Sequence, residues 1–504
     1  MSILRAHPNL RFARKGSVLI GGQPLRLVRL TEAGTRLVRQ WLQPSTTAFT
    51  NRAPMPQGPR ALAQKLVNNG MLQITVDEDL HLESDDYAAH HLAVVIPVKD
   101  DEVGLRASLA QLPPSITVVV VDDGSSPPLN LSDLKAATPA SIHLVRSPRS
   151  QGPAAARNLG VRKLNALGLH SPPEFVCFLD AAVELPSGGL PRLLAIMHAY
   201  SEVTGLAAVA VAPRIAAGPP LTSPSSATSA ITRFEQQHSP LDMGLTPSVV
   251  SPQHAVRYVP STCLVVTGAA FADAGGFDES LRYGEDVDLI WRLSTQGLVL
   301  YAPAVTARHP VRTRLAAVAS QRFGYGTAAA PLAKRHGSVV APLVVSPSLT
   351  AIVGAGFLGR PLVSGILALL TVRKLGHRLT RLVDAPRVEA SMIVSRSVVH
   401  SVEGLAQVLA REYLPVVASL AAITHPRPLR CRSTTTRRKV GALILWRWAR
   451  KATTAKQYRQ WPQHFALAAI DDIAYGLGVW AGVIKQRSTR ALHPRRANDS
   501  VVGG

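Results

Sequence analysis

A short acidic stretch, RYGEDVDLIWRL at residues 282–293, has residue types and a spacing that could do chemistry. It places Glu285, Asp286 and Asp288 directly before an apolar run with helical spacing. Carboxylates at the start of a helix often only cap free N–H groups and complement the helix dipole, and we interpret Asp288 in this way. A carboxylate at this place can also take a proton from a hydroxyl group, which is the work of a general base.

Two further acidic sites lie where apolar segments end. Asp122 and Asp123 close the run ITVVVV and are followed by Gly124 and Ser125, which allow a sharp turn. Asp180 closes the run FVCFL in the same way. Such carboxylates can accept hydrogen bonds from a nucleobase or from ribose hydroxyls. The alternative for the Asp122 segment is an ordinary turn held by the aspartate side chain.

The stretch QGPAAARN at residues 151–158 has the features of a helix start that binds a nucleotide. Pro153 suits the first helical position, and the small residues after it permit a close approach. Arg157 then offers a cation to a phosphate or a base near the helix N-terminus. A well-started amphipathic helix without a ligand is the alternative interpretation.

Alternating apolar runs and helical segments indicate the fold that positions these residues. We expect four strands, at 92–98, 116–122, 142–145 and 175–180, with helices from Gly104 and over 153–167. Strands that alternate with crossover helices form a parallel, doubly wound sheet. Ligands of such sheets bind at the carboxyl ends of the strands, where Asp122, Asp123 and Asp180 fall.

The first 88 residues indicate a small winged-helix-like module. Two short strands, SVLI and LRLVR, are joined by a turn with two glycines, and Thr31 can cap the helix that follows. A second helix over 61–69 and a strand over 71–75 complete the order. The order resembles modules that capture a leader or precursor peptide by strand addition. A DNA-binding winged helix and a packing appendage are the alternatives, although neither helix has the dense Lys/Arg face that DNA requires.

The region after residue 336 is apolar at first and then basic. Residues 339–372 contain one charged residue, Arg360, but also several prolines and glycines, so a spanning helix and a re-entrant or interfacial element are both compatible with it. Residues 427–459 hold eleven Lys/Arg around Trp446 and Trp448. This combination suits the cytoplasmic face of an anionic membrane, and a solvated basic helix or a nucleic-acid patch is the alternative.

The composition of the 504-residue chain restricts the class of protein further. A net charge of +23 favours phosphate-bearing partners such as nucleotides, anionic lipid or nucleic acid. The three cysteines, Cys177, Cys263 and Cys431, lack metal-ligand or disulfide spacing, and the N-terminus lacks the apolar core of a secretion signal. We therefore expect a cytoplasmic protein, at the inner face of the cell membrane if it binds lipid.

The order of five motifs resembles the family-2 glycosyltransferases, which have the GT-A fold. The motifs lie between residues 92 and 314 and read VVIPV, VVVVDDGS, GPAAARNLG, FLDA and GGFDESLRYGEDVDLIWRL, followed by a His-Pro at His309. The chain as a whole, with its N-terminal module and later QRFGYG segment, is similar to members that glycosylate a peptide-derived redox cofactor. The expected domains are a winged-helix-like module at 1–88, a GT-A domain at 89–336 and a mainly helical region at 337–504.

The resemblance implies a role for each candidate residue. Asp286 would be the general base with Glu285 as its helper. Residues around the nucleotide sugar would be Pro97, Asp122, Asp123, Gly124, Arg157 and Asp180. A divalent cation, Mg²⁺ or Mn²⁺, would neutralise the departing diphosphate, and its ligands would be Asp180, His309 and Glu184.

One departure from the family pattern concerns the metal. Where the family has Asp-x-Asp, this chain has Asp180-Ala181-Ala182, so the second carboxylate is missing. Glu184, two positions further, or water would have to compensate.

The expected function is inverting transfer of a hexose, glucose from UDP-glucose, to a peptide-derived small molecule, with growth of a β-glucan-like chain. The QRFGYG segment is similar to a motif of processive synthases and suggests repeated addition. The alternatives are a membrane-bound polysaccharide or glycolipid synthase and a non-catalytic peptide-binding scaffold with a degenerate metal motif. We do not expect nucleic acid to be a partner.

Overall fold

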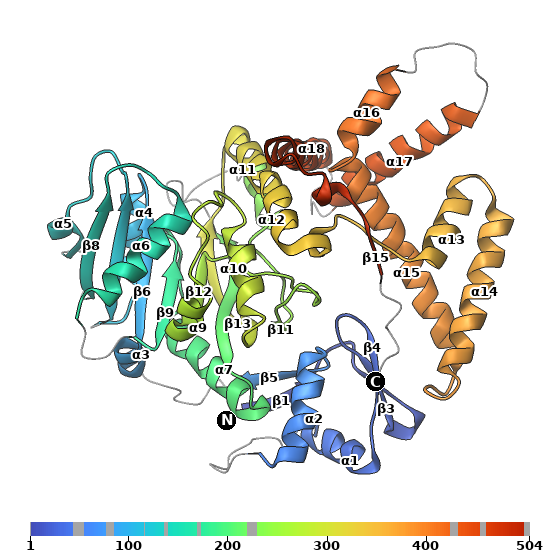
Figure 1. Cartoon of the computed structure of the whole chain (residues 1–504), viewed down its shortest axis with the longest axis horizontal. Helices are drawn as coiled ribbons and strands as arrows, with labels where there is room; N and C mark the ends of the chain where they lie inside the picture. Colours follow the sequence, from blue (N-terminus) through green and yellow to red (C-terminus); the bar gives the residue numbers. More distant parts are fainter. Residues whose placement is uncertain are drawn as a thin grey trace. The chain divides into compact units, whose positions relative to one another are not determined.

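The structure of the chain is a computed structural model (Figure 1). It describes residues 2–43, 55–76, 85–114, 116–135, 140–168, 173–218, 229–423, 432–453 and 460–497. The chain forms two compact units. The first unit comprises residues 1–12, 19–226 and 238–311, and the second comprises 13–18, 227–237 and 312–504. The division into three domains at residues 88 and 336 stays a prediction.

An eight-stranded mixed sheet forms the core of the first unit (Figure 1). Its strands lie in the order β11 (Ser248–Val249), β13 (Leu298–Pro310), β10 (Ala208–Gly218), β12 (Cys263–Thr267), β9 (Phe175–Leu179), β6 (Leu92–Val98), β7 (Thr117–Asp123) and β8 (Ser141–Ser147).

The four predicted strands are the parallel half of this sheet. β6 pairs in parallel with both β7 and β9, and β7 pairs in parallel with β8. The central valines of β7 are fully buried, as expected for a strand covered on both faces. β12 runs antiparallel to β9 and to β10, so the sheet is mixed and differs from the wholly parallel sheet that the sequence pattern indicates. The sequence pattern did not predict β10 to β13.

Helices cover the parallel half of the sheet and bring the motif residues to its edge. α4 (Glu102–Leu109) and α6 (Pro153–Asn165) confirm the two predicted helices. α6 lies on β6 and β7 at Gly160, where an added Cβ would come within 2.3 Å of Val95 Cγ1. α7 (Gly189–Thr204), α9 (Gly268–Asp273) and α10 (Glu285–Leu293) complete the helices that matter to the site.

The N-terminal elements follow the predicted order. β3 (Val18–Gly21) and β4 (Arg26–Arg29) are the predicted hairpin strands, and β2 (Arg11–Ala13) adds a third strand beside β3. Thr31 caps α1 (Glu32–Trp41), because its Oγ1 accepts a hydrogen bond from Gly34 N at 3.1 Å. The second predicted helix begins earlier than expected, as α2 (Gln57–Asn68), and β5 (Leu72–Val76) pairs antiparallel with β1 (Ser2–Ala6). Peptide capture by this module stays a prediction.

The second unit is mainly helical, as predicted. Its helices are α8 (Ala230–His238), α11 (Leu315–Thr327), α12 (Ala329–His336), α13 (Pro347–Phe357), α14 (Pro361–Leu379), α15 (Pro386–Ala410), α16 (Leu414–Ile423), α17 (Arg432–Ala452) and α18 (Trp461–Gln486). The apolar segment 339–372 does not form one spanning helix: the chain passes from a 3-10 turn at 337–340 through β14 (Val344–Val345) to α13 and α14. Gly359, with φ of 75°, breaks the path between these two helices.

Glycines allow α11 and α18 to pack backbone against backbone. A Cβ on Gly326 would lie 2.1 Å from Tyr475 O, and one on Gly478 would lie 2.0 Å from Phe323 O. Gly482 meets Thr327 O in the same way, at 2.6 Å. Gly326 of the QRFGYG segment therefore has a packing role in the second unit. The suggested repeated addition of sugars stays a prediction.

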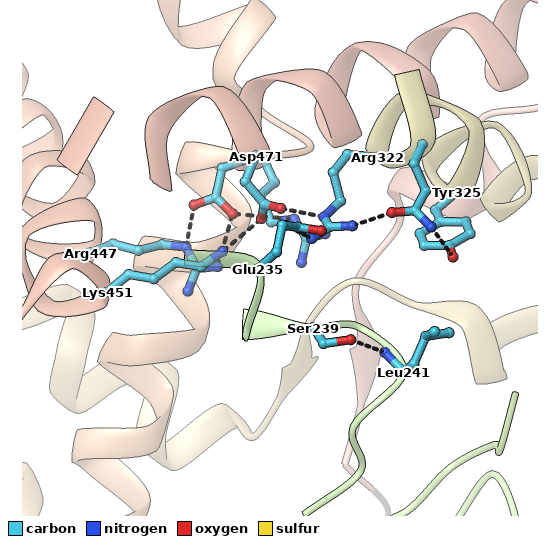
Figure 2. Close-up of polar contacts among 11 residues, drawn as sticks. Glu235, Ser239, Leu241, Arg322, Tyr325, Arg447, Lys451 and Asp471 are labelled. Atoms are coloured by element: carbon cyan, nitrogen blue, oxygen red, sulfur yellow. Dashed lines mark hydrogen bonds and ion pairs between the residues drawn. The ribbon is translucent and has the colours of Figure 1, made fainter. Parts of the chain in front are cut away.

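A buried ion network joins α8, α11, α17 and α18 (Figure 2). Arg322 donates from Nη2 to Glu235 Oε1 at 2.6 Å and from Nε to Asp471. Lys451 Nζ donates to Asp471 Oδ2 at 2.6 Å. Arg322, Glu235 and Asp471 are each at most 6% exposed, so the network lies in the interior.

α18 is the one described helix with the length and mean hydropathy to cross a membrane. Half of its most apolar window is buried against other parts of the chain. Asp471 and Asp472 lie within it, and Asp472 Oδ2 accepts a hydrogen bond from Arg447 Nε at 2.7 Å. These buried ion pairs are the features of a core helix of the second unit.

Candidate active site

Arg157 lies at the centre of a cluster of carboxylates in the first unit. Its Nη2 donates to Asp180 Oδ1 at 2.7 Å, and its Nη1 donates to Glu285 Oε1 at 3.2 Å. The guanidinium also lies 5.3 Å from the ring centroid of Phe277. Arg157 is 3% exposed, whereas the side chain of Asp180 is 29% exposed. The structure therefore brings together Arg157, Asp180 and Glu285, which are far apart in the sequence.

The end of β7 positions the start of α6 and with it Arg157. The Asp123 carboxylate accepts hydrogen bonds from Ser150 Oγ at 2.8 Å, Gln151 N at 2.8 Å and Gly152 N at 3.0 Å. Gly152, with φ of 98°, precedes Pro153 at the first turn of the helix. Asp123, the last residue of β7, thus holds the loop that enters α6.

A glycine is required at the turn after Asp123. Gly124 has φ of 77°, a conformation that residues with a Cβ rarely adopt. A Cβ at this position would also lie 2.7 Å from Ser150 N. Gly124 therefore allows β7 and the loop at 150–152 to approach closely.

Asp122 and Pro97 lie at the same end of the parallel strands. Asp122 is fully buried, and its carboxylate accepts hydrogen bonds from Ser125 N at 2.8 Å and Leu129 N at 3.3 Å. Burial raises the pKa of Asp122, but these hydrogen bonds and Arg146 outweigh it, so the pKa lies below its usual value. Asp122 thus makes the turn that we named as an alternative. Pro97, on β6, pairs with Val121 of β7 and is half-buried. Nucleotide contacts of both residues stay predictions.

Glu285 and Asp286 lie side by side in the first turn of α10. Burial and the neighbouring charge of Asp286 raise the pKa of Glu285 to about 7, although Arg157 lowers it. Burial also raises the pKa of Asp286, with Asp180 adding to the effect, while the Val287 N–H and Arg157 oppose it. Two adjacent carboxyl groups with raised pKa values accept a proton more readily than exposed carboxyl groups do.

Asp288 has a structural role, as interpreted from the sequence. It is fully buried and accepts a hydrogen bond from Arg292 Nη2 at 2.7 Å. Arg292 Nη2 also donates to Gly276 O at 2.8 Å, which ties α10 to the loop before it. This loop carries Phe277, whose ring packs on Phe178 at 5.0 Å between centroids. Asp288 and Arg292 therefore support the ring that Arg157 faces.

Asn158 is a positioning residue that the sequence did not predict. Its Oδ1 accepts a hydrogen bond from Phe277 N at 3.0 Å, and its Nδ2 donates to Phe277 O at 2.8 Å. The signal was its place directly after Arg157 in the motif GPAAARNLG. Asn158 and Arg157 thus act together, the first on the backbone of Phe277 and the second on its ring.

The candidate metal ligands do not form a cation site by themselves. Glu184 and Arg308 exchange backbone hydrogen bonds of 2.8 Å, so Glu184 lies beside the strand of His309. Successive side chains of a strand point to opposite faces, so Glu184 shares the face of Arg308 rather than that of His309. Within the described ranges, no group of three or more His, Cys, Asp or Glu side chains could hold a metal ion. A role of Asp180, Glu184 and His309 as metal ligands stays a prediction.

Ala182 occupies a backbone conformation that an aspartate tolerates better. Its φ is 68°, in the left-handed region where Asn and Asp are enriched among residues with a Cβ. The side chain is 3% exposed and packs against Gly104, where an added Cβ would lie 2.7 Å from Ala182 Cβ. The chain therefore forms this turn without a carboxylate at residue 182.

Comparisons with known proteins define the class. The family model described as "Glycosyl transferase family 2" matches residues 93–238. The chain is 33% identical over 496 residues to the Pre-mycofactocin glycosyltransferase of Mycobacterium tuberculosis, in two strains, with 96% of each chain covered. The chain therefore belongs to the family-2 glycosyltransferases, and its mixed sheet with helices on the parallel half is the GT-A fold.

Solved structures with related folds are more distant. A mannosyltransferase of Pyrobaculum calidifontis in complex with GDP-Man and Mn²⁺ has 15% identity and a TM-score of 0.36, over 76% of this chain and 85% of that one. The S. aureus TarS structure in complex with UDP-GlcNAc has 14% identity and a TM-score of 0.32, over 79% of this chain and 92% of that one.

Proposed function

We propose that this glycosyltransferase moves a hexose, glucose from UDP-glucose, with inversion onto mycofactocin or its precursor. The observation that carries the proposal is that Glu285 and Asp286, two neighbouring carboxyl groups with raised pKa values, lie beside the buried Arg157. The name of the relative, Pre-mycofactocin glycosyltransferase, supports the acceptor. The N-terminal strands would hold the peptide-derived part of that acceptor by strand addition.

Asp286 would be the base of a single displacement. It takes the proton from an acceptor hydroxyl as the oxygen attacks C1 of the sugar, and the bond from C1 to the diphosphate oxygen breaks on the opposite side. The electron pair of that bond leaves with UDP, and the configuration at C1 changes from α to β. Repeated transfer to the new sugar would give a β-glucan-like chain.

Arg157 and Glu285 would set the charge of the base rather than act on the sugar. Arg157 stabilises the ionised carboxylates on either side of it, and Glu285, with its pKa of about 7, changes charge near neutral pH. A charged Glu285 makes proton uptake by Asp286 more favourable because like charges repel.

The donor would lie at the carboxyl ends of β6, β7 and β9, near Pro97, Asp123 and Gly124. A divalent cation, Mg²⁺ or Mn²⁺, would enter with the diphosphate, since phosphate oxygens are hard ligands. The mannosyltransferase structure with GDP-Man and Mn²⁺ is an example of such a donor complex. Asp180 is the partly exposed carboxylate nearest to Arg157 and would contact that cation. We expect this reaction in the cytoplasm, where nucleotide sugars are made.

The test is a transfer assay with the purified full chain and Mn²⁺. The acceptor is the peptide-derived precursor of mycofactocin. UDP-glucose, UDP-GlcNAc and GDP-mannose are offered in parallel, and mass spectrometry counts the hexose units added. The expected result is β-linked glucose from UDP-glucose, with Asp286→Asn inactive but still able to bind UDP. Transfer to lipid acceptors only would favour a membrane-bound synthase. Peptide binding without hydrolysis or transfer of any donor would favour a scaffold.

A further inference from the structure

An exposed apolar stripe lies on the first three turns of α14 in the second unit. Leu362 is 82% exposed, Ile366 59%, Leu369 68% and Leu370 55%. Their spacing of i, i+4, i+7 and i+8 places them on one face of the helix. Side chains of this size are seldom exposed as a group in a protein that stays in water. The stripe therefore needs a partner that covers apolar surface.

The stripe continues into the loop that joins α13 to α14. Leu358 in this loop is 70% exposed. The loop has a defined conformation, because Arg360 N donates to Ala355 O at 2.9 Å across Gly359. Ser364 Oγ donates to Ile352 O at 2.8 Å and ties α14 to α13. The two helices thus form a built hairpin with an apolar tip.

Cations follow the stripe on the same helix. Arg373 and Lys374 are exposed, and Arg373 lies one turn beyond Leu369 on the same face. Arg360 at the tip is exposed as well. The sequence contains no Asp or Glu from residue 289 to residue 383 but twelve Lys and Arg. The surface that continues the stripe is therefore complementary to anions.

The apolar turns of α14 are shorter than a bilayer is thick. From Leu362 to Arg373 the helix rises by about 16 Å, at about 1.5 Å for each residue. The hydrocarbon core of a bilayer is about 30 Å thick. The apolar turns of α14 are thus too short to span a bilayer, but their exposed face can lie in the interface of one leaflet, where Arg360 at one end and Arg373 at the other meet the headgroups.

We propose that the α13–α14 hairpin inserts into one leaflet of an anionic lipid bilayer and holds the enzyme at the membrane surface. With α14 lying in the plane of the membrane, its apolar face and Leu358 enter the boundary of the acyl region, while Arg360, Arg373 and Lys374 contact phosphate headgroups. This inference is independent of the sugar and the acceptor named above. It gives the basic second unit a partner of defined chemistry.

The experiment is co-sedimentation of the full chain with vesicles, without detergent. Phosphatidylcholine vesicles are compared with vesicles that contain one quarter phosphatidylglycerol, at low and high salt. We expect binding to the anionic vesicles, with a loss of tenfold or more in the double variant Leu362→Ser/Leu369→Ser. Arg373→Gln/Lys374→Gln should lose about fivefold for each charge removed and should bind with less dependence on salt.

A matched control removes exposed apolar side chains from the first unit. Val103 and Leu245 are 65% and 74% exposed, so Val103→Ser/Leu245→Ser makes the same chemical change elsewhere. Circular dichroism and thermal unfolding establish that each variant folds. The proposal is overturned if the wild-type chain does not bind anionic vesicles, or if the α14 variant binds as the control does. It is also overturned if light scattering shows that the stripe forms a dimer of the chain and vesicles do not compete with that dimer.

Discussion

Two buried arginines, Arg157 in the first unit and Arg322 in the second, each bind two carboxylates but in different electrostatic surroundings. Arg157 is the cation among Asp180, Glu285 and Asp286, and the pKa of Glu285 is raised to about 7. Around Arg322, the pKa of Asp471 is lowered to about 2: burial raises it, but Lys451 and Arg322 outweigh that effect. Burial raises the pKa of Glu235 in the same network.

The difference follows from the ratio of charges. Three carboxylates share Arg157, so each added negative charge there is disfavoured and a proton is bound readily. Lys451 supplies a second cation beside Arg322, so Asp471 stays ionised. A buried ion pair gives little net stability, but removal of one partner leaves an uncompensated charge. We therefore expect substitutions in the Arg157 cluster to lower the catalytic rate, and substitutions in the Arg322 network to lower the free energy of unfolding.

The largest expected effect is on catalysis, in Asp286→Asn. Loss of the proposed base should lower kcat by about 10²- to 10⁴-fold without lowering the temperature of unfolding, because the Asp286 charge is disfavoured in the folded chain. Asp273→Asn, which alters an exposed carboxylate on α9, is the matched control and should keep full activity. Steady-state transfer rates and calorimetry measure the two quantities. If the Asp286→Asn variant were active, Asp286 would not be the general base.

The next effect is on stability, in Arg322→Met. Glu235 and Asp471 would remain buried with one cation fewer, which should cost about 3–5 kcal/mol in the free energy of unfolding of the second unit. Arg396→Met, at an exposed position on α15, should have little effect. Urea unfolding followed by circular dichroism measures both. If the two variants were equally stable, the buried network would not be what stabilises the second unit.

The two clusters should also respond to pH with opposite signs. The raised pKa of Glu285 means that its contribution to stability is complete below about pH 4.5 and is lost as the pH rises to about 7. The stability of Glu285→Gln relative to the wild-type chain should therefore increase between these values and then level off. Asp471, with its lowered pKa, loses its contribution only as the pH falls towards 2.

Unfolding measured from pH 4.5 to 8.5 tests this difference. Glu285→Gln should show the slope, and Asp471→Asn should be destabilised by the same amount at every pH in the range. If the stabilities of Glu285→Gln and of the wild-type chain changed with pH in parallel, Glu285 would be ionised over the whole range. The Arg157 cluster would then not carry the excess negative charge that raises the pKa of Glu285.

The smallest expected effect comes from adding a carboxylate close to Asp180, which binds Arg157. Ala182→Asp restores the Asp-x-Asp spacing at a position whose φ of 68° an aspartate tolerates. We expect UDP binding to depend on Mn²⁺ at severalfold lower concentrations of the ion, as measured by calorimetric titration. Ala181→Asp places the same charge one residue away and serves as the control. An equal response of both variants would show that only the added charge matters.

Local sequence determined the central strands of the sheet and the starts of several helices. The continuous apolar runs at 92–98 and 116–122 predict central parallel strands because both of their faces must be buried. Thr31 and Pro153 mark helix starts, and Asp288 was correctly interpreted as a structural carboxylate in the first turn of α10. Each of these follows from contacts within a few residues, which the order of residue types specifies.

Only the tertiary structure decided which charges meet. Arg157 and Glu285 are separated by more than a hundred residues. The antiparallel β12, which the sequence pattern did not reveal, pairs with β9, the strand that leads to Asp180. The same holds for Arg322, which pairs with Glu235 and Asp471 from two other helices. A pKa depends on burial and on all nearby charges, so the raised pKa of Glu285 and the lowered pKa of Asp471 arise only once the chain has folded.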